Sequence, residues 1–166
     1  MLMSWPGLSD FLVQNWGNLA SVVGVMVSVA TLAVATKARQ AAEAAKALAR
    51  RQSLAEVLQD TVRKNEQVGL FLSQRRWDIV WLRAQEIAGA TSIVLTRWPQ
   101  ELSDSSKDNL LRSQRLSSSI AGVALIASGE APPPPAIARM SQAQGRVAQL
   151  LNTELGESLR SSEGSK

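Results

Sequence analysis

The sequence predicts an all-α protein in which a single-pass N-terminal transmembrane helix continues into a cytoplasmic antiparallel bundle of about four helices. Three observations support this fold class. The chain contains only 6 Pro, 10 Gly and 2 Phe and no Tyr, and this composition favours helices over strands. A long run near the N-terminus is free of charge. The remaining segments repeat apolar residues at helical spacing.

The charge-free run extends from Phe11 to Thr36 and is 26 residues long. At a rise of about 1.5 Å per residue, such a helix measures about 39 Å and exceeds the roughly 30 Å hydrocarbon core of a bilayer. A soluble core helix of this length would carry charges on an exposed edge, and a cleavable signal peptide would begin with a basic region, which residues 1–10 lack. We therefore expect residues 11–36 to span a membrane and residues 1–10 to form a short extracytoplasmic N-terminus.

Basic residues are concentrated on one side of this predicted span. None precedes it, whereas the fifteen residues after it contain Lys37, Arg39, Lys46, Arg50 and Arg51, here called the basic collar. Because basic flanks are retained in the cytoplasm, we expect the N-terminus outside and the body inside, in a bacterial inner membrane. The collar would also contact anionic lipid headgroups, although its topogenic role explains it without a further function.

Small side chains recur along one face of the predicted span at alternating steps of four and three. They form the small-residue seam, which consists of Gly17, Ser21, Gly24, Ser28, Thr31 and Ala35. Such a face allows two helices to approach closely in lipid and predicts self-association into a homo-oligomer. The spacing continues into residues 38–49, but that segment contains seven Ala and would fit almost any register.

The segment after the span is expected to remain helical to about residue 72, because residues 37–68 contain neither Pro nor Gly. A polar run over residues 73–76 then predicts a turn and an antiparallel return. The next helix should extend from Trp77 to Trp98, where Pro99 ends it. Residues 37–130 would together form the helical hairpin or bundle.

The returning helix contains most of the aromatic residues of the predicted bundle. One stripe at helical spacing consists of Trp77, Trp81, Ala84, Ala88, Thr91, Leu95 and Trp98, and the adjoining flank consists of Val80, Ile87 and Val94. The stripe predicts the side that faces the core. Because Trp is also favoured at protein–protein hot spots, the three Trp residues are either core or a partner-binding face.

Three segments complete the chain. A third helix is expected to begin at a cap within residues 103–106. Its uncharged part, residues 116–129, is too short to span a membrane, and we expect it to be buried. A re-entrant or interfacial segment is the alternative. Four prolines make residues 131–136 an extended linker. Residues 137–160 should form the C-terminal helix, and residues 161–166 a disordered tail.

The absence of Cys and His removes the commonest metal ligands and the commonest general base near neutral pH. The chain also lacks a Gly-rich phosphate loop, a nucleophile elbow and a dense basic patch. We therefore expect no enzyme, no cofactor, no metal site and no nucleic-acid partner.

Two functions fit the predicted architecture. The first is a membrane-anchored adaptor or scaffold that presents its helical bundle to an unknown cytoplasmic protein. The alternative is an oligomeric membrane-perturbing effector, holin-like or pore-forming, in which Ser21, Ser28 and Thr31 line a narrow path between several spans. The lipid bilayer is a partner in both.

Overall fold

The computed structural model describes residues 6–127, 129 and 131–163, with side chains for residues 21–160 of these ranges. Within them the chain is all-helical and contains no strand, as the sequence predicts. The four helices are α1 (Pro6–Ser73), α2 (Trp77–Arg97), α3 (Asp104–Ala127) and α4 (Pro134–Glu163). The chain divides into an N-terminal unit, Met1–Ala47, and a bundle unit, Leu48–Lys166.

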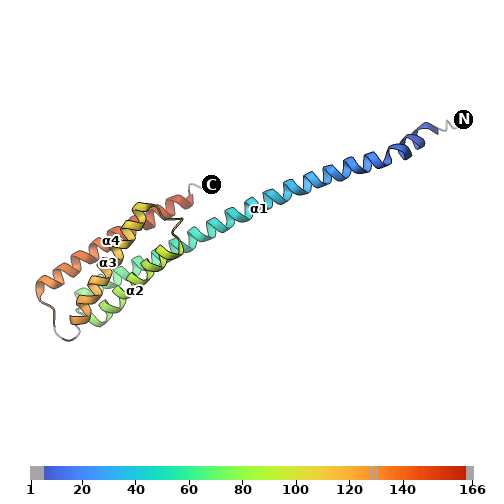
Figure 1. The fold of residues 1–166 in the computed structure, drawn as a ribbon. Coiled ribbons are helices and arrows are strands. Elements are labelled where there is room, and N and C mark those ends of the chain that lie inside the picture. Colours follow the sequence, from blue (N-terminus) through green and yellow to red (C-terminus); the bar gives the residue numbers. More distant parts are fainter. Residues whose placement is uncertain (1–5, 128, 130, 164–166) are drawn as a thin grey trace. The chain divides into compact units, whose positions relative to one another are not determined.

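The bundle unit consists of the C-terminal part of α1 and the helices α2, α3 and α4, which lie side by side (Figure 1). Ion pairs join Arg50 to Glu101 and Lys64 to Glu86, so α2 returns antiparallel to α1. Hydrogen bonds from Ser106 to Glu157 and from Asn109 to Glu154 show that α3 and α4 are antiparallel as well. A further hydrogen bond between α1 and α4 closes the ring of four helices.

The buried residues of the bundle helices recur at alternating steps of four and three. On α1 they are Leu54, Leu58, Thr61, Asn65, Val68 and Leu72; on α2 and its C-cap they are Val80, Ala84, Ile87, Thr91, Val94 and Trp98. On α3 the series is Ser106, Leu110, Ser113, Ser117, Ile120, Ala124 and Ala127. A repeat of about 3.5 residues aligns one face of each helix with the bundle axis, as in coiled-coil packing. The core therefore has a heptad-like pattern that includes several polar positions.

The core-facing side of α2 differs from the predicted stripe. Val80, Ile87 and Val94, expected on the flank, are almost fully buried, whereas Ala88 and Leu95 are half-buried. The helix is thus rotated slightly toward its β-branched residues. The bulky indoles of Trp77 and Trp81 lie at the edge of the interface, where a large side chain is buried without displacing its neighbours.

The ends of α1 and α3 are formed by local hydrogen bonds. At the end of α1, Arg75 adopts a left-handed φ of 57°, and the N–H of Arg76 donates to the carbonyl of Phe71 in a Schellman-type turn. At the start of α3, the Ser103 hydroxyl accepts a hydrogen bond from the N–H of Ser106. The cap therefore lies within the predicted residues 103–106.

Three segments differ from expectation. The extended proline run ends at Pro133, because α4 begins at Pro134; prolines are tolerated in a first helical turn, whose N–H groups lack intrahelical partners. Helix α4 extends to Glu163, so residues 161–163 of the expected disordered tail are helical, while residues 164–166 lie outside the described chain. The uncharged part of α3 is buried on one face only, because Leu125 and Ile126 are 56% and 77% exposed.

Candidate functional site

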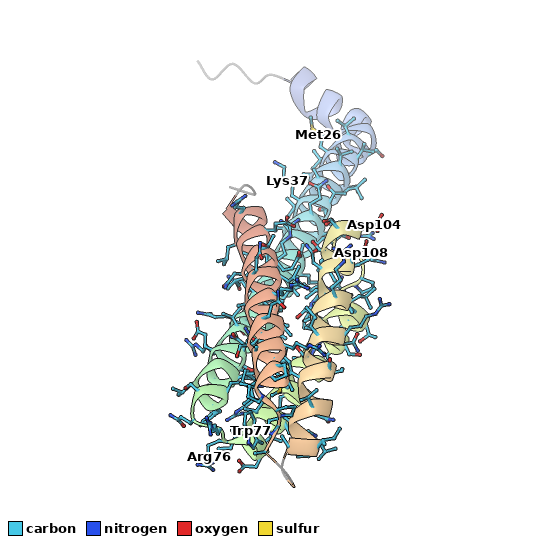
Figure 2. All side chains as sticks on the ribbon, turned by 90° about the vertical axis from the view of Figure 1, so that its left-hand side faces the viewer. Met26, Lys37, Arg76, Trp77, Asp104 and Asp108 are labelled. Carbon is cyan, nitrogen blue, oxygen red and sulfur yellow. The ribbon has the colours of Figure 1, made fainter. Side chains whose placement is uncertain are left out.

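The first candidate site is the apolar segment of α1, defined here as residues 21–36. Every side chain in it is exposed, and Figure 2 shows those around Met26 projecting from the helix. Its large hydrophobic residues are 57–69% exposed: Val22, Val23, Val25, Met26, Val27, Val29, Leu32 and Val34. In the described chain this is the helix that is long and apolar enough to cross a membrane, a criterion that an N-terminal signal sequence also meets.

Three polar side chains of the apolar segment form hydrogen bonds with their own helix. The hydroxyl of Ser28 donates to the carbonyl of Gly24, and that of Thr31 donates to the carbonyl of Val27, both at 2.8 Å. The Thr36 hydroxyl donates to the carbonyl of Ala33 at 2.9 Å. Because these hydroxyls already have partners, they add little to the cost of placing the segment in hydrocarbon.

The small-residue seam lies on this exposed helix. Its members from Ser21 to Ala35 are exposed, and a Cβ atom added at Gly24 would meet nothing within 4 Å. Gly17 belongs to α1, but it lies outside the residues whose side chains are described. The seam is therefore free of intramolecular packing along its described part, and self-association through it stays a prediction.

The basic collar is divided between the two units. Lys37, Arg39 and Lys46 belong to the N-terminal unit, where Arg39 pairs with Glu43 at 3.1 Å on a solvent-exposed face. Arg50 and Arg51 belong to the bundle unit. Arg50 approaches Glu101 at 3.8 Å, so this residue takes part in the structure of the bundle as well as adding positive charge after the apolar segment.

The three Trp residues of the predicted core or partner face all contact the core. Trp98 is 3% exposed, and Trp77 and Trp81 are half-buried against the same cluster. Trp77 lies at the end of the bundle that contains the α1–α2 turn, far from Asp104 (Figure 2). Trp98 is therefore a core residue, whereas Trp77 and Trp81 are partly accessible to solvent.

Polar contacts that the apolar periodicity did not reveal join α4 to α1. The Asn65 side-chain amide donates to the carbonyl of Gln144 at 3.3 Å, and the Gln144 amide donates to the carbonyl of Asn65 at 3.1 Å. Asn65 is 1% exposed. This reciprocal pair fixes the register of α4 against α1, much as a buried Asn does in coiled coils.

A second set of polar contacts joins α3 to α4. Glu154 is 3% exposed and accepts a hydrogen bond of 2.8 Å from the Asn109 amide. Ser106, which belongs to the cap of α3, donates to Glu157 at 3.2 Å. Ser106 belongs to the heptad-like series of α3, and this position is its signal in the sequence. The partner of each of these residues depends on the register of another helix.

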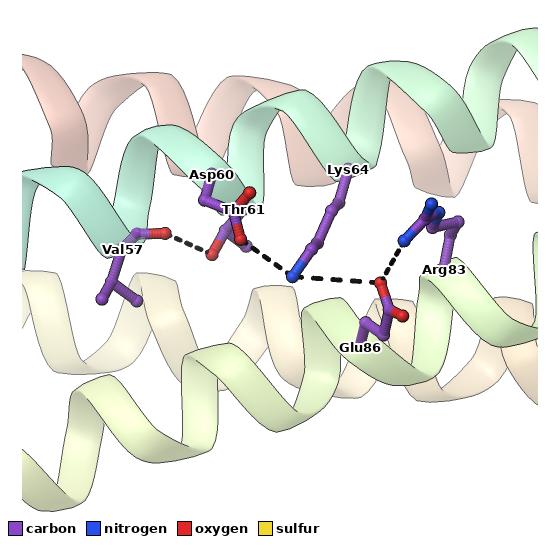
Figure 3. A network of polar contacts seen from close by, with 6 residues as sticks. All are labelled: Val57, Asp60, Thr61, Lys64, Arg83 and Glu86. Atoms are coloured by element: carbon purple, nitrogen blue, oxygen red, sulfur yellow. Dashed lines mark hydrogen bonds and ion pairs between the residues drawn. The ribbon is translucent and has the colours of Figure 1, made fainter.

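A charged network joins α1 to α2 at the bundle surface (Figure 3). The Lys64 ammonium lies 2.8 Å from Asp60 and 3.9 Å from Glu86. Glu86 in turn accepts a hydrogen bond of 2.7 Å from Arg83 on its own helix. The side chains of Lys64, Arg83 and Glu86 are about one third exposed or less, so the network orients the two helices while remaining hydrated.

One titratable side chain at the α1–α2 turn has a shifted pKa. A hydrogen bond from the Arg76 guanidinium lowers the pKa of the Asp78 carboxyl from 3.8. Asp78 also lies in the first turn of α2, where the backbone N–H of Ile79 favours its charged form. Among the described residues, no group of three or more His, Cys, Asp or Glu side chains is arranged to hold a metal ion.

Comparison with known proteins identified no relative: no protein-family model, curated protein or solved structure matches the chain.

Proposed function

We propose that the protein is a membrane-anchored, non-enzymatic adaptor whose helical bundle binds a cytoplasmic protein. The observation that supports this most is the contrast between the two units. The apolar segment exposes all of its large hydrophobic side chains, whereas the bundle unit has its own buried core. Insertion into a bilayer removes the exposed apolar surface from water without any change to the core of the bundle.

The proposed orientation places the N-terminus outside and the bundle in the cytoplasm, at a bacterial inner membrane. Lys37, Arg39 and Lys46 follow the apolar segment directly and are exposed, as topogenic charges would be. In this orientation the whole bundle unit faces cytoplasmic proteins.

The Trp-bearing helix offers the proposed contact surface. Trp77 and Trp81 are half-buried, and the neighbouring Leu82 and Ile93 on α2 are 46% and 53% exposed. Aromatic and aliphatic side chains held by a rigid core are typical anchors of protein–protein interfaces. We therefore expect the outer face of α2 to contribute to partner binding.

The holin-like alternative is less well supported by the hydrogen bonds of the apolar segment. A polar path between several spans would require Ser28 and Thr31 to direct their hydroxyls toward water or a neighbouring span. Both donate instead to carbonyls of their own helix. These bonds favour a segment that is in contact with lipid.

Proximity labelling of the full chain in its native membrane tests the proposal. A labelling enzyme at the C-terminus should recover the same cytoplasmic proteins in repeated experiments, and Leu82→Glu with Ile93→Glu should reduce their recovery. The same enzyme at the N-terminus is the control and should not recover them. Failure to recover any reproducible partner from the C-terminus would contradict the adaptor function, and dye leakage on induced expression would favour the membrane-perturbing alternative.

A further inference from the structure

A surface cavity that is widely open to solvent, with a volume of about 600 Å³, lies in the bundle unit, where α1 passes the connection between α2 and α3. The α1 side contributes Ala49, Arg50 and Ser53, and the other side includes Arg97, Trp98 and Glu101. Small-molecule sites in proteins commonly enclose roughly 300–1,000 Å³, so the cavity is large enough for a small ligand. Its lining contains two guanidinium groups, and the proposed adaptor function does not use them.

Arg97 is an exposed residue that lies against the wall of this cavity. Its guanidinium carbon lies 5.0 Å from the centroid of the Trp98 ring. Trp98 is 3% exposed and forms part of the core, so the surface on which Arg97 stacks is rigid. A cation–π contact does not use the N–H groups of a guanidinium, so they stay available for hydrogen bonds.

Arg50 approaches the cavity from α1 and is only loosely paired. Its guanidinium lies 3.8 Å from the Glu101 carboxylate, which is at the outer limit of an ion pair. The Arg50 side chain is 66% exposed, whereas that of Glu101 is 19% exposed. An anion with better geometry would displace this contact, because a bidentate bond to a guanidinium is shorter and stronger than a 3.8 Å ion pair.

We propose that the cavity binds a phosphoryl group, held between the guanidinium groups of Arg50 and Arg97. The half-buried hydroxyl of Ser53 lines the same cavity and would serve as a further donor. Glu101 has two effects in this site: it orients Arg50 when the site is empty and repels the anion as it enters. We expect the site to bind phosphate-bearing molecules with moderate affinity, independently of the adaptor function.

Phosphoryl groups reach such a site either as free phosphate compounds or as phospholipid headgroups. Both present the same tetrahedral anion to the two guanidinium groups. The experiment uses the full chain in nanodiscs. Inorganic phosphate is titrated against nanodiscs of neutral lipid while Trp fluorescence is recorded, and lipid retention from discs containing phosphatidylglycerol is measured separately by native mass spectrometry.

Arg97→Ala and Arg50→Ala are expected to weaken binding about tenfold, as is typical for the loss of one charge-assisted contact. Glu101→Gln should strengthen it severalfold, because the competing carboxylate is removed. Arg112→Ala is the matched control: it removes the same charge from an exposed position on α3 outside the cavity and should change affinity less than twofold.

Saturable phosphate binding with this order of affinities would support a soluble ligand. The same order seen only in phosphatidylglycerol retention would support a lipid headgroup. The proposal would be overturned if neither probe binds, or if Arg112→Ala weakens binding as much as Arg97→Ala. Unfolding curves of each variant show whether the bundle is intact. If Arg97→Ala and Arg50→Ala both unfold it, the affinities of Arg97→Lys and Glu101→Gln are compared instead.

Discussion

Asn65 is an amide in a helix face that is otherwise suited to apolar packing. Its side chain and backbone both bond to Gln144, and Gln144 lies beside Gly69, where a Cβ atom would come within 3.2 Å of the Gln144 amide nitrogen. The absence of a side chain at Gly69 therefore makes room for the pair. The register of α4 depends on this small group of residues.

Removal of the Asn65 amide should destabilise the bundle. Asn65→Ala removes the hydrogen bond to the Gln144 carbonyl together with the Asn65 Oδ1, a buried acceptor that has no partner among the described residues, and we expect the free energy of unfolding to fall by about 0.5–1.5 kcal/mol. Gln59→Ala, at an exposed position on the same helix, is the control and should change it by less than about 0.5 kcal/mol. Urea unfolding of the full chain in detergent measures both. Equal effects would show that the pair does not hold α4.

Buried serines on α3 should respond in opposite ways to replacement by Ala. The Ser113 hydroxyl is fully buried and has no hydrogen-bond partner among the described residues, so Ser113→Ala should leave stability unchanged or raise it by up to about 1 kcal/mol. Ser106→Ala should lower it by about 1 kcal/mol, because the Ser106 hydroxyl contacts Ser103 and Glu157. Thermal unfolding measures the stability of both variants. If Ser113→Ala lowers stability as much as Ser106→Ala does, the Ser113 hydroxyl has a hydrogen-bond partner that the structure does not show.

At the scale of helices, two glycines provide a matched test of interhelical packing. At Gly89 on α2 an added Cβ meets nothing within 4 Å, so Gly89→Ala should stabilise the bundle by about 0.5–1 kcal/mol through helix propensity. Gly69→Ala should lose this gain, because its Cβ presses on the Gln144 amide and disturbs the bond to Asn65. Parallel denaturation curves test the difference. An equal gain at both positions would mean that Gln144 moves aside at no cost.

Local sequence signals predicted the four helices more accurately than their packing. The turn after residue 72, the start of α2 at Trp77 and a cap within residues 103–106 follow from polar runs and capping chemistry. The core-facing side of α2 was placed slightly wrongly, because the Trp stripe and the Val80 flank have the same periodicity. Packing against the neighbouring helices determines which of these two faces of α2 points toward the core.

The candidate sites were predictable to different degrees for the same reason. The predicted span, residues 11–36, is evident from 26 residues without charge, since composition alone determines it. The pairs formed by Asn65 and by Glu154, and the cavity beside Arg97, combine residues more than forty positions apart. Their positions depend on the register between helices, which single-sequence periodicity does not specify. In the sequence alone, such a contact is indicated only by a polar residue at a position of the heptad-like series.

At the scale of the whole molecule, the proposed function requires the apolar segment to be a retained membrane anchor. An anchored chain resists extraction by alkaline carbonate, whereas a chain cleaved after a signal sequence is released and begins near residue 37. Val27→Arg, near the middle of the apolar segment, should reduce membrane retention, since a central Arg costs about 2.5 kcal/mol or more on insertion scales.

The most direct measurement uses the absence of Cys in the natural chain. Single cysteines introduced by Ser9→Cys and Ser162→Cys are reacted with a membrane-impermeant maleimide, first in intact bacterial cells with a permeabilised outer membrane and then after lysis. For a retained anchor with its N-terminus outside, we expect position 9 to be labelled in the intact cells and position 162 to be labelled only after lysis. Labelling of position 162 in intact cells, or loss of position 9 from the mature protein, would contradict this expectation.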